Sequence, residues 1–414
     1  MTIPDIVPEP IGDGTPLSGL TTMRVGGPAE RVLVARSSDD LVRFATELWD
    51  EGEPWLLLGG GSNTVVCDEG FPGAVLLVRS SGIAVIDGGD GGGADGIGCA
   101  DAGADAGAEP GVRGIAPSGT VRLRVQAGHD WDRLVAACVD RGWAGIEALS
   151  GIPGLAGAAP VQNIGAYGQE LSEVLHSIEF LDRESGEVQR LSAADLGLGY
   201  RDSAIKRGLE GVVLSIDLLL ADESGDERPL SAPVRYAQLA GALGVAIGDR
   251  VPLRELRDSV LRLRASKGMV LDPADHDSWS AGSFFTNPIV AERFARTLPE
   301  DAPRFQAGGV DPEPAVTTFE ELAAGVPLRM PQPAPEREVK LSAAWLIEHA
   351  GVPRGFRLPG SGAAVSSKHT LAITNRGAAT AADVAELARF VVQRVQQEFG
   401  VILAPEPNLY GLEL

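Results

Sequence analysis

Cysteine, histidine and lysine are scarce in this sequence of 414 residues. The three cysteines are an odd number without CxxC spacing, and the five histidines form no HxxxH or HExxH pattern. A disulfide framework and a protein-bound metal site are therefore not expected. No apolar run is long enough to span a bilayer, and residues 1–14 carry acids and prolines where a signal peptide needs a basic and then an apolar segment. These absences predict a soluble, cytoplasmic protein.

Positive charge is also in short supply. The chain has 35 Lys and Arg against 57 Asp and Glu, a formal net charge of −22. Such a field repels nucleic acid and anionic membrane surfaces, so we expect neither as a partner. We also expect the chain to be a monomer. An anionic ligand would have to be bound by a local cluster against this field. The length and the 44% hydrophobic content predict two or three domains with real cores.

The pattern of apolar, capping and breaking residues predicts alternating strands and helices. Ser37 or Ser38 can cap a helix that ends before Gly52, and Pro252 suits the start of another. Residues 87–117, rich in Gly, Ala and Asp, and residues 299–337, rich in proline, are interpreted as surface insertions. We expect helices at about 38–51, 130–141, 253–266, 342–350 and 381–398, and strands at 31–35, 55–58, 75–78, 120–126, 178–181, 212–220 and 401–403.

Two glycine-rich segments contain the most informative patterns. The loop GGGSNT at residues 59–64 directly follows an apolar strand, where successive backbone N–H groups could bind a phosphate or form an ordinary tight turn. It lacks the GK[ST] ending of a P-loop. Residues 151–168 combine many glycines with Ile, Leu, Val and Tyr, which indicates backbone packed closely against a ligand or against neighbouring backbone. A GxGxxG match at residues 91–96 lies in the first insertion with no helix after it, and we discard it.

Seven motifs in order resemble one family. They are TMRVGGPA at 22–29, GGGSN at 59–63, IPG to YG at 152–168, YRDS at 200–203, GSFFTNP at 282–288, KLSAAWLI at 340–347 and PEP at 405–407. Together they resemble the UDP-N-acetylenolpyruvoylglucosamine reductases, flavoenzymes of peptidoglycan precursor synthesis. The resemblance implies an α+β fold, with an FAD-binding half of the vanillyl-alcohol-oxidase type in two lobes (15–80 and 81–227) and a C-terminal α+β substrate-binding domain (228–414).

The resemblance also implies the reaction and the cofactor site. FAD takes electrons from NADPH and reduces UDP-N-acetylglucosamine-enolpyruvate to UDP-N-acetylmuramate. Oriented backbone amides, rather than a basic surface, would bind the anionic cofactor. By resemblance the FAD site comprises Arg24, Gly26, Gly59, Gly60, Gly61, Ser62, Asn63, Thr64, Gly151, Ile152, Pro153, Gly154, Gly157, Ala158, Asn163, Gly165, Ala166 and Tyr167.

The family's catalytic residues correspond to Arg201, Ser283 and Glu406. Hydride transfer to C3 of the enolpyruvyl group builds negative charge at C2, which requires a cation, an enolate stabiliser and a proton donor. Arg201 can bind a carboxylate or enolate with its planar fork, Glu406 between two prolines can stabilise the enolate if its pKa is raised, and Ser283 would protonate C2. The simpler alternatives are an exposed Arg201–Asp202 ion pair, a turn serine and a solvated loop acid.

Substrate binding is assigned to Tyr200, Tyr236, Lys267 and Asn287 by the same resemblance. Arg264 and Lys267 are three residues apart and would share a helix face if the helix continues that far. All four lysines of the chain lie in or beside motifs, and we interpret this as a need for a compact ammonium group at some of these places.

One departure from the family pattern concerns the loop that closes over the substrate. Residues 290–339 contain no tyrosine, whereas the family usually has one there, and Phe305 is a possible apolar replacement. Two other functions are compatible with parts of the pattern. A flavin oxidase of a sugar or lactone often attaches its flavin through His or Cys, and neither occurs at 59–64 or 151–168. A non-catalytic flavin- or nucleotide-sugar-binding regulator would not need the three catalytic residues.

Overall fold

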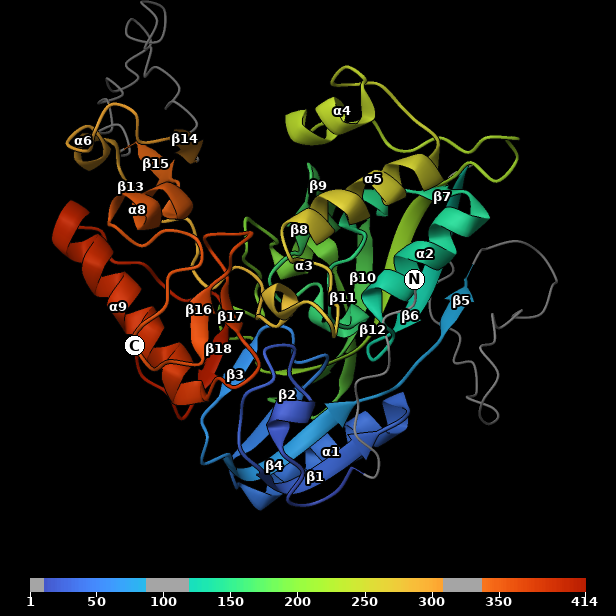
Figure 1. Ribbon diagram of the computed structural model, residues 1–414. Coiled ribbons are helices and arrows are strands. Elements are labelled where there is room, and N and C mark those ends of the chain that lie inside the picture. The colour runs from blue at the N-terminus through green and yellow to red at the C-terminus, as the bar shows by residue number, and fades with distance from the viewer. Residues whose placement is uncertain (1–10, 87–118, 308–336) are drawn as a thin grey trace, which may run out of the picture.

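The computed structural model describes residues 11–86, 119–307 and 337–414 (Figure 1). The predicted insertion at 87–117 lies outside the described residues, as do positions 308–336 of the second one. The chain has mixed α and β structure, with two sheets in its N-terminal half and a separate helix-rich C-terminal part, so the predicted α+β class is confirmed.

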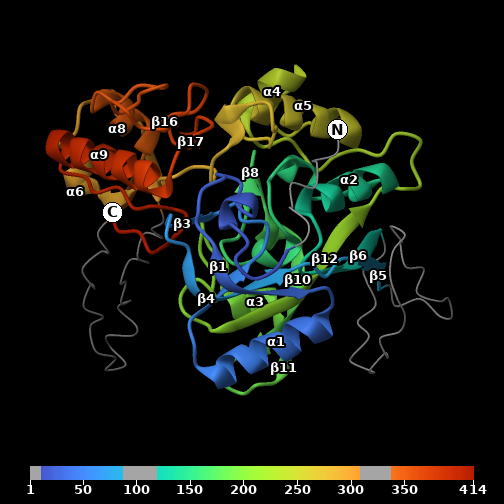
Figure 2. The same cartoon turned by 60° about the horizontal axis from the view of Figure 1, so that its bottom comes forward.

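The first sheet is small and parallel. It contains β1 (Ala29–Ala35), β4 (Phe71–Val78) and β2 (Trp55–Leu58), in that order. Helix α1 (Ser38–Glu51) connects β1 to β2; the Ser37 side chain accepts the amide of Asp40, and Gly52 ends the helix in the left-handed conformation. The apolar face of α1 packs between this sheet and the larger one (Figure 2). The predicted strand–helix–strand unit is therefore confirmed.

The second sheet is antiparallel and larger. Its main order is β11 (Val188–Ser192), β10 (Leu175–Asp182), β12 (Gly211–Asp222), β6 (Thr120–Gln126) and β5 (Ile83–Val85), and β7 (Trp143–Ala144) also pairs with β12. Along β6 the apolar side chains alternate with two arginines, so only one face of this strand is apolar. That face packs against α2 (Trp131–Arg141), which in turn contacts α5 (Leu253–Ser266). Short helices α3 (Ala193–Leu196) and α4 (Ala237–Leu243) and the hairpin of β8 (Gly165–Ala166) and β9 (Gln169–Glu170) complete this region.

The C-terminal part is organised around α9 (Ala381–Phe399). Val384, Leu387, Val391 and Val395 recur on its buried face. They belong to one core with α8 (Ala343–His349) and the pair β16 (Ala363–Val365) and β17 (Ile373–Asn375). A three-stranded antiparallel sheet of β13 (Ile289–Ala291), β15 (Glu338–Leu341) and β14 (Arg304–Ala307), with α6 (Glu292–Ala295), lies beside α8.

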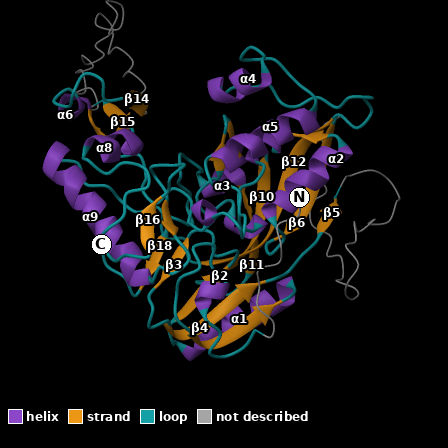
Figure 3. Ribbon diagram, in the orientation of Figure 1, coloured by secondary structure: helices purple, strands orange, loops and turns teal. Residues whose placement is uncertain are grey.

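The two ends of the sequence meet in a parallel strand pair. Strand β3 (Thr64–Val66) follows the glycine loop and pairs with β18 (Asn408–Tyr410). The strand predicted at 401–403 is wrong: Val401 and Leu403 are buried in the C-terminal core, but this segment joins no ladder in the part of the chain that the structure describes. The buried side chains of Val401 and Leu403 on either side of the exposed Ile402 reflect packing into the core rather than sheet pairing. Between the sheets and the C-terminal helices, much of the chain is loop (Figure 3), and the three predicted catalytic residues are on these loops.

Candidate active site

The two glycine-rich segments touch each other through their backbones. The Ser62 hydroxyl donates to the carbonyl oxygen of Pro153 at 3.0 Å. A Cβ atom on Gly60 would lie 2.9 Å from the Cα of Gly154, and one on Gly61, which has φ +60°, would lie 2.1 Å from the carbonyl oxygen of Leu20. Close backbone packing, the simpler of the two interpretations, therefore explains these glycines already.

The same loop also leaves amides for an anion. The backbone N–H groups of residues 60–63 donate to no acceptor within residues 11–86, 119–307 and 337–414. Successive unpaired amides after a strand form a concave anion site. The packing that requires glycine and the free amides therefore coexist, and the loop fits the diphosphate of a dinucleotide such as FAD.

Arg79 is a cation at this loop that the sequence interpretation missed. Its Nη1 donates to the carbonyl oxygens of Gly59 at 3.1 Å and of Val78 at 2.7 Å, and burial lowers its pKa. The signal was available: β2 and β4 are parallel neighbours with Leu58 opposite Leu77, so the residues that follow them lie at one edge of the sheet.

The second glycine segment is fixed mainly by protein contacts. The backbone N–H of Gly157 donates to the carbonyl oxygen of Ala127 at 2.8 Å, and Ala127 leaves no room for a side chain on Gly157. The side-chain Nδ2 of Asn163 donates to the carbonyl oxygen of Gly199 at 3.0 Å and to the carboxylate of Glu170 at 3.1 Å. Asn163, predicted to contact the cofactor, thus joins this segment to the loop that carries Tyr200 and Arg201.

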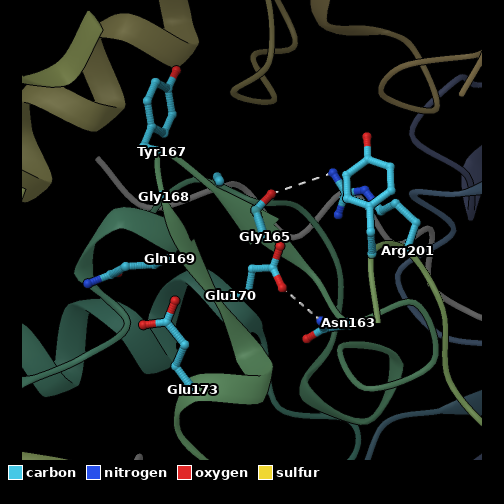
Figure 4. A pocket seen from close by; sticks show the side chains of 10 residues that line it. Asn163, Gly165, Tyr167, Gly168, Gln169, Glu170, Glu173 and Arg201 are labelled. Carbon is cyan, nitrogen blue, oxygen red and sulfur yellow. Dashed lines mark hydrogen bonds between the residues drawn. The ribbon is translucent and has the colours of Figure 1, made fainter. Parts of the chain in front are cut away.

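The β8–β9 hairpin lines a cavity of about 270 Å³ (Figure 4). Tyr167 and Gly168 form its turn with φ of 50° and 85°. Tyr200 and Arg201 line the cavity from the other side, and Arg201 Nη2 lies 3.5 Å from the carbonyl oxygen of Gly165. The structure therefore places Asn163, Gly165, Ala166 and Tyr167 beside one predicted catalytic residue.

The N-terminal turn is held by the C-terminal part of the chain. The Thr22 hydroxyl donates to the carbonyl of Ser280 at 2.6 Å, and the Asn375 side chain donates to the carbonyls of Met23 and Arg24. The Arg24 guanidinium lies 3.8 Å from the centre of the Trp279 ring, and burial lowers its pKa. Gly26 is closely packed as well, since a Cβ there would lie 3.3 Å from two side chains.

The three predicted catalytic residues come from distant segments. Arg201 Nε lies 3.5 Å from Glu406 Oε1. The backbone amide of Glu406 donates to the carbonyl oxygen of Phe284 at 2.9 Å. Because Phe284 directly follows Ser283, this bond places the Ser283 segment beside the Glu406 loop. Asn63 Nδ2 donates to the carbonyl oxygen of Glu406 at 3.3 Å, so the glycine loop also contacts this loop.

The simpler alternatives for Arg201 and Glu406 do not describe their surroundings. Asp202 pairs with Arg207, and Arg201 instead approaches Glu406. The Glu406 side chain is only 12% exposed. Burial raises the pKa of Glu406, and the charges of Arg201 and Lys206 oppose that rise. Ser283 is half-buried, and its hydroxyl has no hydrogen-bond partner among the residues with described positions.

The predicted substrate residues are distributed around the cavity with different partners. Tyr200 is 49% exposed, and Lys340 Nζ lies 4.1 Å from its ring centre. Tyr236 lies edge-on to Tyr167 at 5.6 Å, and Lys267 Nζ is also 5.6 Å from the Tyr167 ring.

Asn287 and the Arg264–Lys267 pair have contacts that the sequence did not predict. The Asn287 side-chain oxygen accepts the amide of Ala343 at the start of α8, so it already has a structural partner. Helix α5 ends at Ser266 and Lys267 is its C-cap, so the condition for a shared helix face, that the helix continues through Lys267, is not met. Arg264 instead donates to the carbonyl of Met269, and burial lowers its pKa to about 10.

Three of the four lysines lie around this site. Lys206 donates to the carbonyl of Arg201, and Lys340 and Lys267 lie over tyrosine rings. Lys368 is different, since its Nζ pairs with Asp275 at 2.6 Å. Across the described ranges there is no group of three or more His, Cys, Asp and Glu side chains that could hold a metal ion.

The fold and the site define the class of protein. Residues 29–192 match the model of an FAD-binding domain, and this range contains the first sheet, both glycine segments and every strand of the second sheet except β12. The parallel lobe, the antiparallel lobe and the separate C-terminal part are those of a flavoprotein of the vanillyl-alcohol-oxidase fold with an added domain, as predicted.

Further comparisons identify the family. Residues 272–410 match the C-terminal domain model of UDP-N-acetylenolpyruvoylglucosamine reductase. The reductase of that name from Leifsonia xyli subsp. xyli is 58% identical over 97% of this chain and 100% of its own length, and the one from Salinispora arenicola is 44% identical over 99% of both. The crystal structure of the Thermus caldophilus reductase superposes with a TM-score of 0.56 at 24% identity, covering 97% of this chain and 99% of that chain. The chain belongs to the UDP-N-acetylenolpyruvoylglucosamine reductase family. None of its described helices is long and apolar enough to cross a membrane.

Proposed function

We propose that this chain reduces UDP-N-acetylglucosamine-enolpyruvate to UDP-N-acetylmuramate, using FAD and NADPH, and that Arg201, Ser283 and Glu406 are its catalytic residues. Family membership supports the reaction and the cofactors. The observation that supports the residue roles is the convergence of three distant loops, which places the Arg201–Glu406 pair beside the segment of Ser283.

The cofactor fits the glycine loop. The free amides of residues 60–63 and the Arg79 guanidinium would bind the diphosphate of FAD, and the packed backbones of the two glycine segments fix those amides in advance. When bound, FAD supplies the redox chemistry between NADPH and the enolpyruvyl group. This arrangement explains how a chain with a net charge of −22 binds an anionic cofactor.

The side chains of the chain supply binding, charge and a proton. Arg201 has a planar guanidinium that can bind the carboxylate of the substrate. Burial favours the protonated form of Glu406, which can then donate a hydrogen bond to the enolate oxygen that develops as C3 is reduced. The hydroxyl of Ser283, which has no partner in the described chain, would give its proton to C2.

Stopped-flow kinetics separates these roles. In Ser283→Ala, reduction of bound flavin by NADPH should keep its rate, while oxidation of reduced enzyme by the enolpyruvyl substrate should slow by about 10²- to 10⁴-fold, the usual range for a lost general acid. Ser185→Ala, in an exposed turn, is the control. Equal loss in both half-reactions, or less than threefold loss in the second, would contradict the role of Ser283. A purified protein that cannot be loaded with FAD would contradict the activity itself.

The remaining predictions concern the state of the protein. Its monomeric form and its cytoplasmic location stay predictions, supported by the small-molecule chemistry of the family. Sedimentation velocity of the FAD-loaded protein at micromolar concentration checks the first, and a sedimentation coefficient typical of a dimer would refute it.

A further inference from the structure

Lys206 lies at the active site without a role in the scheme above. Its Nζ donates to the backbone carbonyl oxygen of Arg201 at 2.9 Å. No carboxylate pairs with Lys206 within the three ranges that the structure describes. Many arginines of the described chain pair with carboxylates, whereas Lys206 directs its ammonium at the backbone of a proposed catalytic residue.

The backbone at Arg201 needs such support. Arg201 has φ of 53°, in the left-handed region, which costs a residue with a side chain about 1–2 kcal/mol. Such a conformation persists only where the surroundings fix it. Here Gly199 and Asp202 exchange two backbone hydrogen bonds around the turn, and the Ser203 hydroxyl donates to Val161 at 2.6 Å.

Lys206 is connected to the same turn twice. Its own amide donates to Ser203 Oγ at 3.1 Å, and its Nζ returns to the Arg201 carbonyl. The side chain therefore closes a ring of contacts over the turn from which the Arg201 guanidinium extends toward Glu406. Without the ammonium, the carbonyl of Arg201 loses this hydrogen bond, and the left-handed backbone of Arg201 loses one of the contacts that fix it.

The positive charge of Lys206 also reaches Glu406. The charged groups that act on the Glu406 carboxyl are Arg201 and Lys206, and both lower its pKa against the effect of burial. Arg201 faces the substrate and would be engaged by its carboxylate. Lys206 is exposed but bonded to the Arg201 carbonyl, so its charge stays close to this turn.

We propose that Lys206 is a positioning residue for the reduction: it fixes the backbone from which Arg201 reaches Glu406 and adds a second positive charge beside that carboxyl. The proposal rests on the proposed function. A lysine suits both tasks because a compact ammonium can point one N–H at a carbonyl, whereas a guanidinium is planar and larger.

The test compares Lys206→Met with Arg207→Met in FAD-loaded protein. Both remove one exposed positive charge from the same turn, but Arg207 pairs with Asp202 and contacts neither Arg201 nor Glu406. In Lys206→Met we expect the rate of flavin oxidation by the enolpyruvyl substrate to fall by about 10- to 100-fold, the effect of misplacing a catalytic group by roughly 1 Å. KM and FAD affinity should change by less than about threefold, since the proposal gives Lys206 no contact with either ligand.

The pH profile supplies a readout that a structural role would not move. One limb belongs to Glu406 and should be absent in Glu406→Gln. Loss of a neighbouring cation raises the pKa of that carboxyl, so this limb should move to higher pH in Lys206→Met and stay in place in Arg207→Met. Lys206→Gln keeps an N–H donor without the charge; it should recover much of the rate while retaining the shifted limb. Lys206→Gln also replaces Lys206→Met in this comparison if the methionine variant does not fold.

Each outcome decides the matter. Wild-type rate and an unmoved limb in Lys206→Met would overturn the proposal, as would equal losses in Arg207→Met, which would assign the effect to the turn in general. A wild-type protein that binds FAD but does not turn over the enolpyruvyl substrate would refute the proposed function instead.

Discussion

Gly61→Ala tests whether close backbone packing is what shapes the cofactor loop. Gly61 has φ +60°, and a Cβ there would lie 2.1 Å from the carbonyl oxygen of Leu20. No rotamer relieves a contact between a Cβ atom and backbone, so the loop must move by roughly 1 Å. Gly52→Ala is the matched control, because Gly52 lies in the same lobe with φ +69° but has nothing within 4 Å of its Cβ position.

The two substitutions share one cost and differ in the other. Each places alanine in the left-handed region at about 1–2 kcal/mol. Only Gly61→Ala adds an overpacking cost of about 1–3 kcal/mol. The same loop movement displaces the free amides of residues 60–63. Losing one hydrogen bond to a charged phosphate costs about 1.5–3 kcal/mol, which corresponds to about a 10- to 150-fold weaker FAD complex.

Two measurements check this prediction. Urea unfolding of the apoprotein compares the free energies of unfolding of both variants, and quenching of flavin fluorescence gives the Kd of FAD. We expect normal FAD affinity in Gly52→Ala and the losses above in Gly61→Ala. The reasoning is refuted if Gly61→Ala unfolds within about 0.5 kcal/mol of Gly52→Ala and binds FAD as tightly, since surface substitutions alone vary by that amount.

Three further predictions follow from single contacts. Asn63→Ala removes the hydrogen bond to the carbonyl of Glu406, so kcat should fall by about 3- to 10-fold, in line with about 1 kcal/mol per hydrogen bond, while FAD affinity changes less. If stopped-flow and Kd measurements show a larger loss of FAD affinity than of kcat, the Asn63 side chain is a cofactor ligand instead. Arg79→Gln removes a cation at the amide loop, so FAD binding should weaken by about tenfold or more at low salt, and an unchanged Kd by fluorescence would exclude Arg79 from the site. Asp217 is fully buried between Arg122, Arg124 and Arg190, so Asp217→Asn should lower the free energy of unfolding by about 3–5 kcal/mol at pH 7. Burial alone would raise the pKa of Asp217, but the three arginines leave it below its usual value. The ionised carboxylate therefore stabilises the fold above the unfolded pKa of about 3.9, and this contribution is lost as pH falls through the lower folded pKa. Equal free energies of unfolding for the wild-type and variant proteins in urea at pH 7 would contradict this prediction.

The sequence predicted those elements whose signals are local. Helices α1, α5 and α9 begin and end within a residue or two of expectation, because apolar spacing and terminal residues such as Ser37 and Gly52 act within one turn. The pairing of β18 with β3 was not predicted, since Asn408–Tyr410 is short and its partner lies more than three hundred residues away in the sequence. A short polar strand carries no local signal for a distant partner.

The site shows the same limit. The resemblance selected Arg201, Ser283 and Glu406, but composition and spacing alone could not show that Arg201 approaches Glu406 rather than Asp202. Nor could they show that the side chains of Asn163 and Asn287 already serve protein partners. An asparagine has both donors and acceptors, so its residue type does not reveal which partner it takes.

The distribution of charge explains how an acidic protein can bind two anionic nucleotides. Many arginines far from the site pair with carboxylates, as Arg183 does with Glu210. Around the site, by contrast, Arg79, Lys267 and Lys340 contact carbonyl oxygens, an amide oxygen or aromatic rings, and none of them pairs with a carboxylate among the positions that the structure describes. Cations held by neutral partners keep their charge available to a ligand, whereas paired ones do not. The net charge of −22 therefore does not decide phosphate binding, which depends on the cations near the site that have no carboxylate partner.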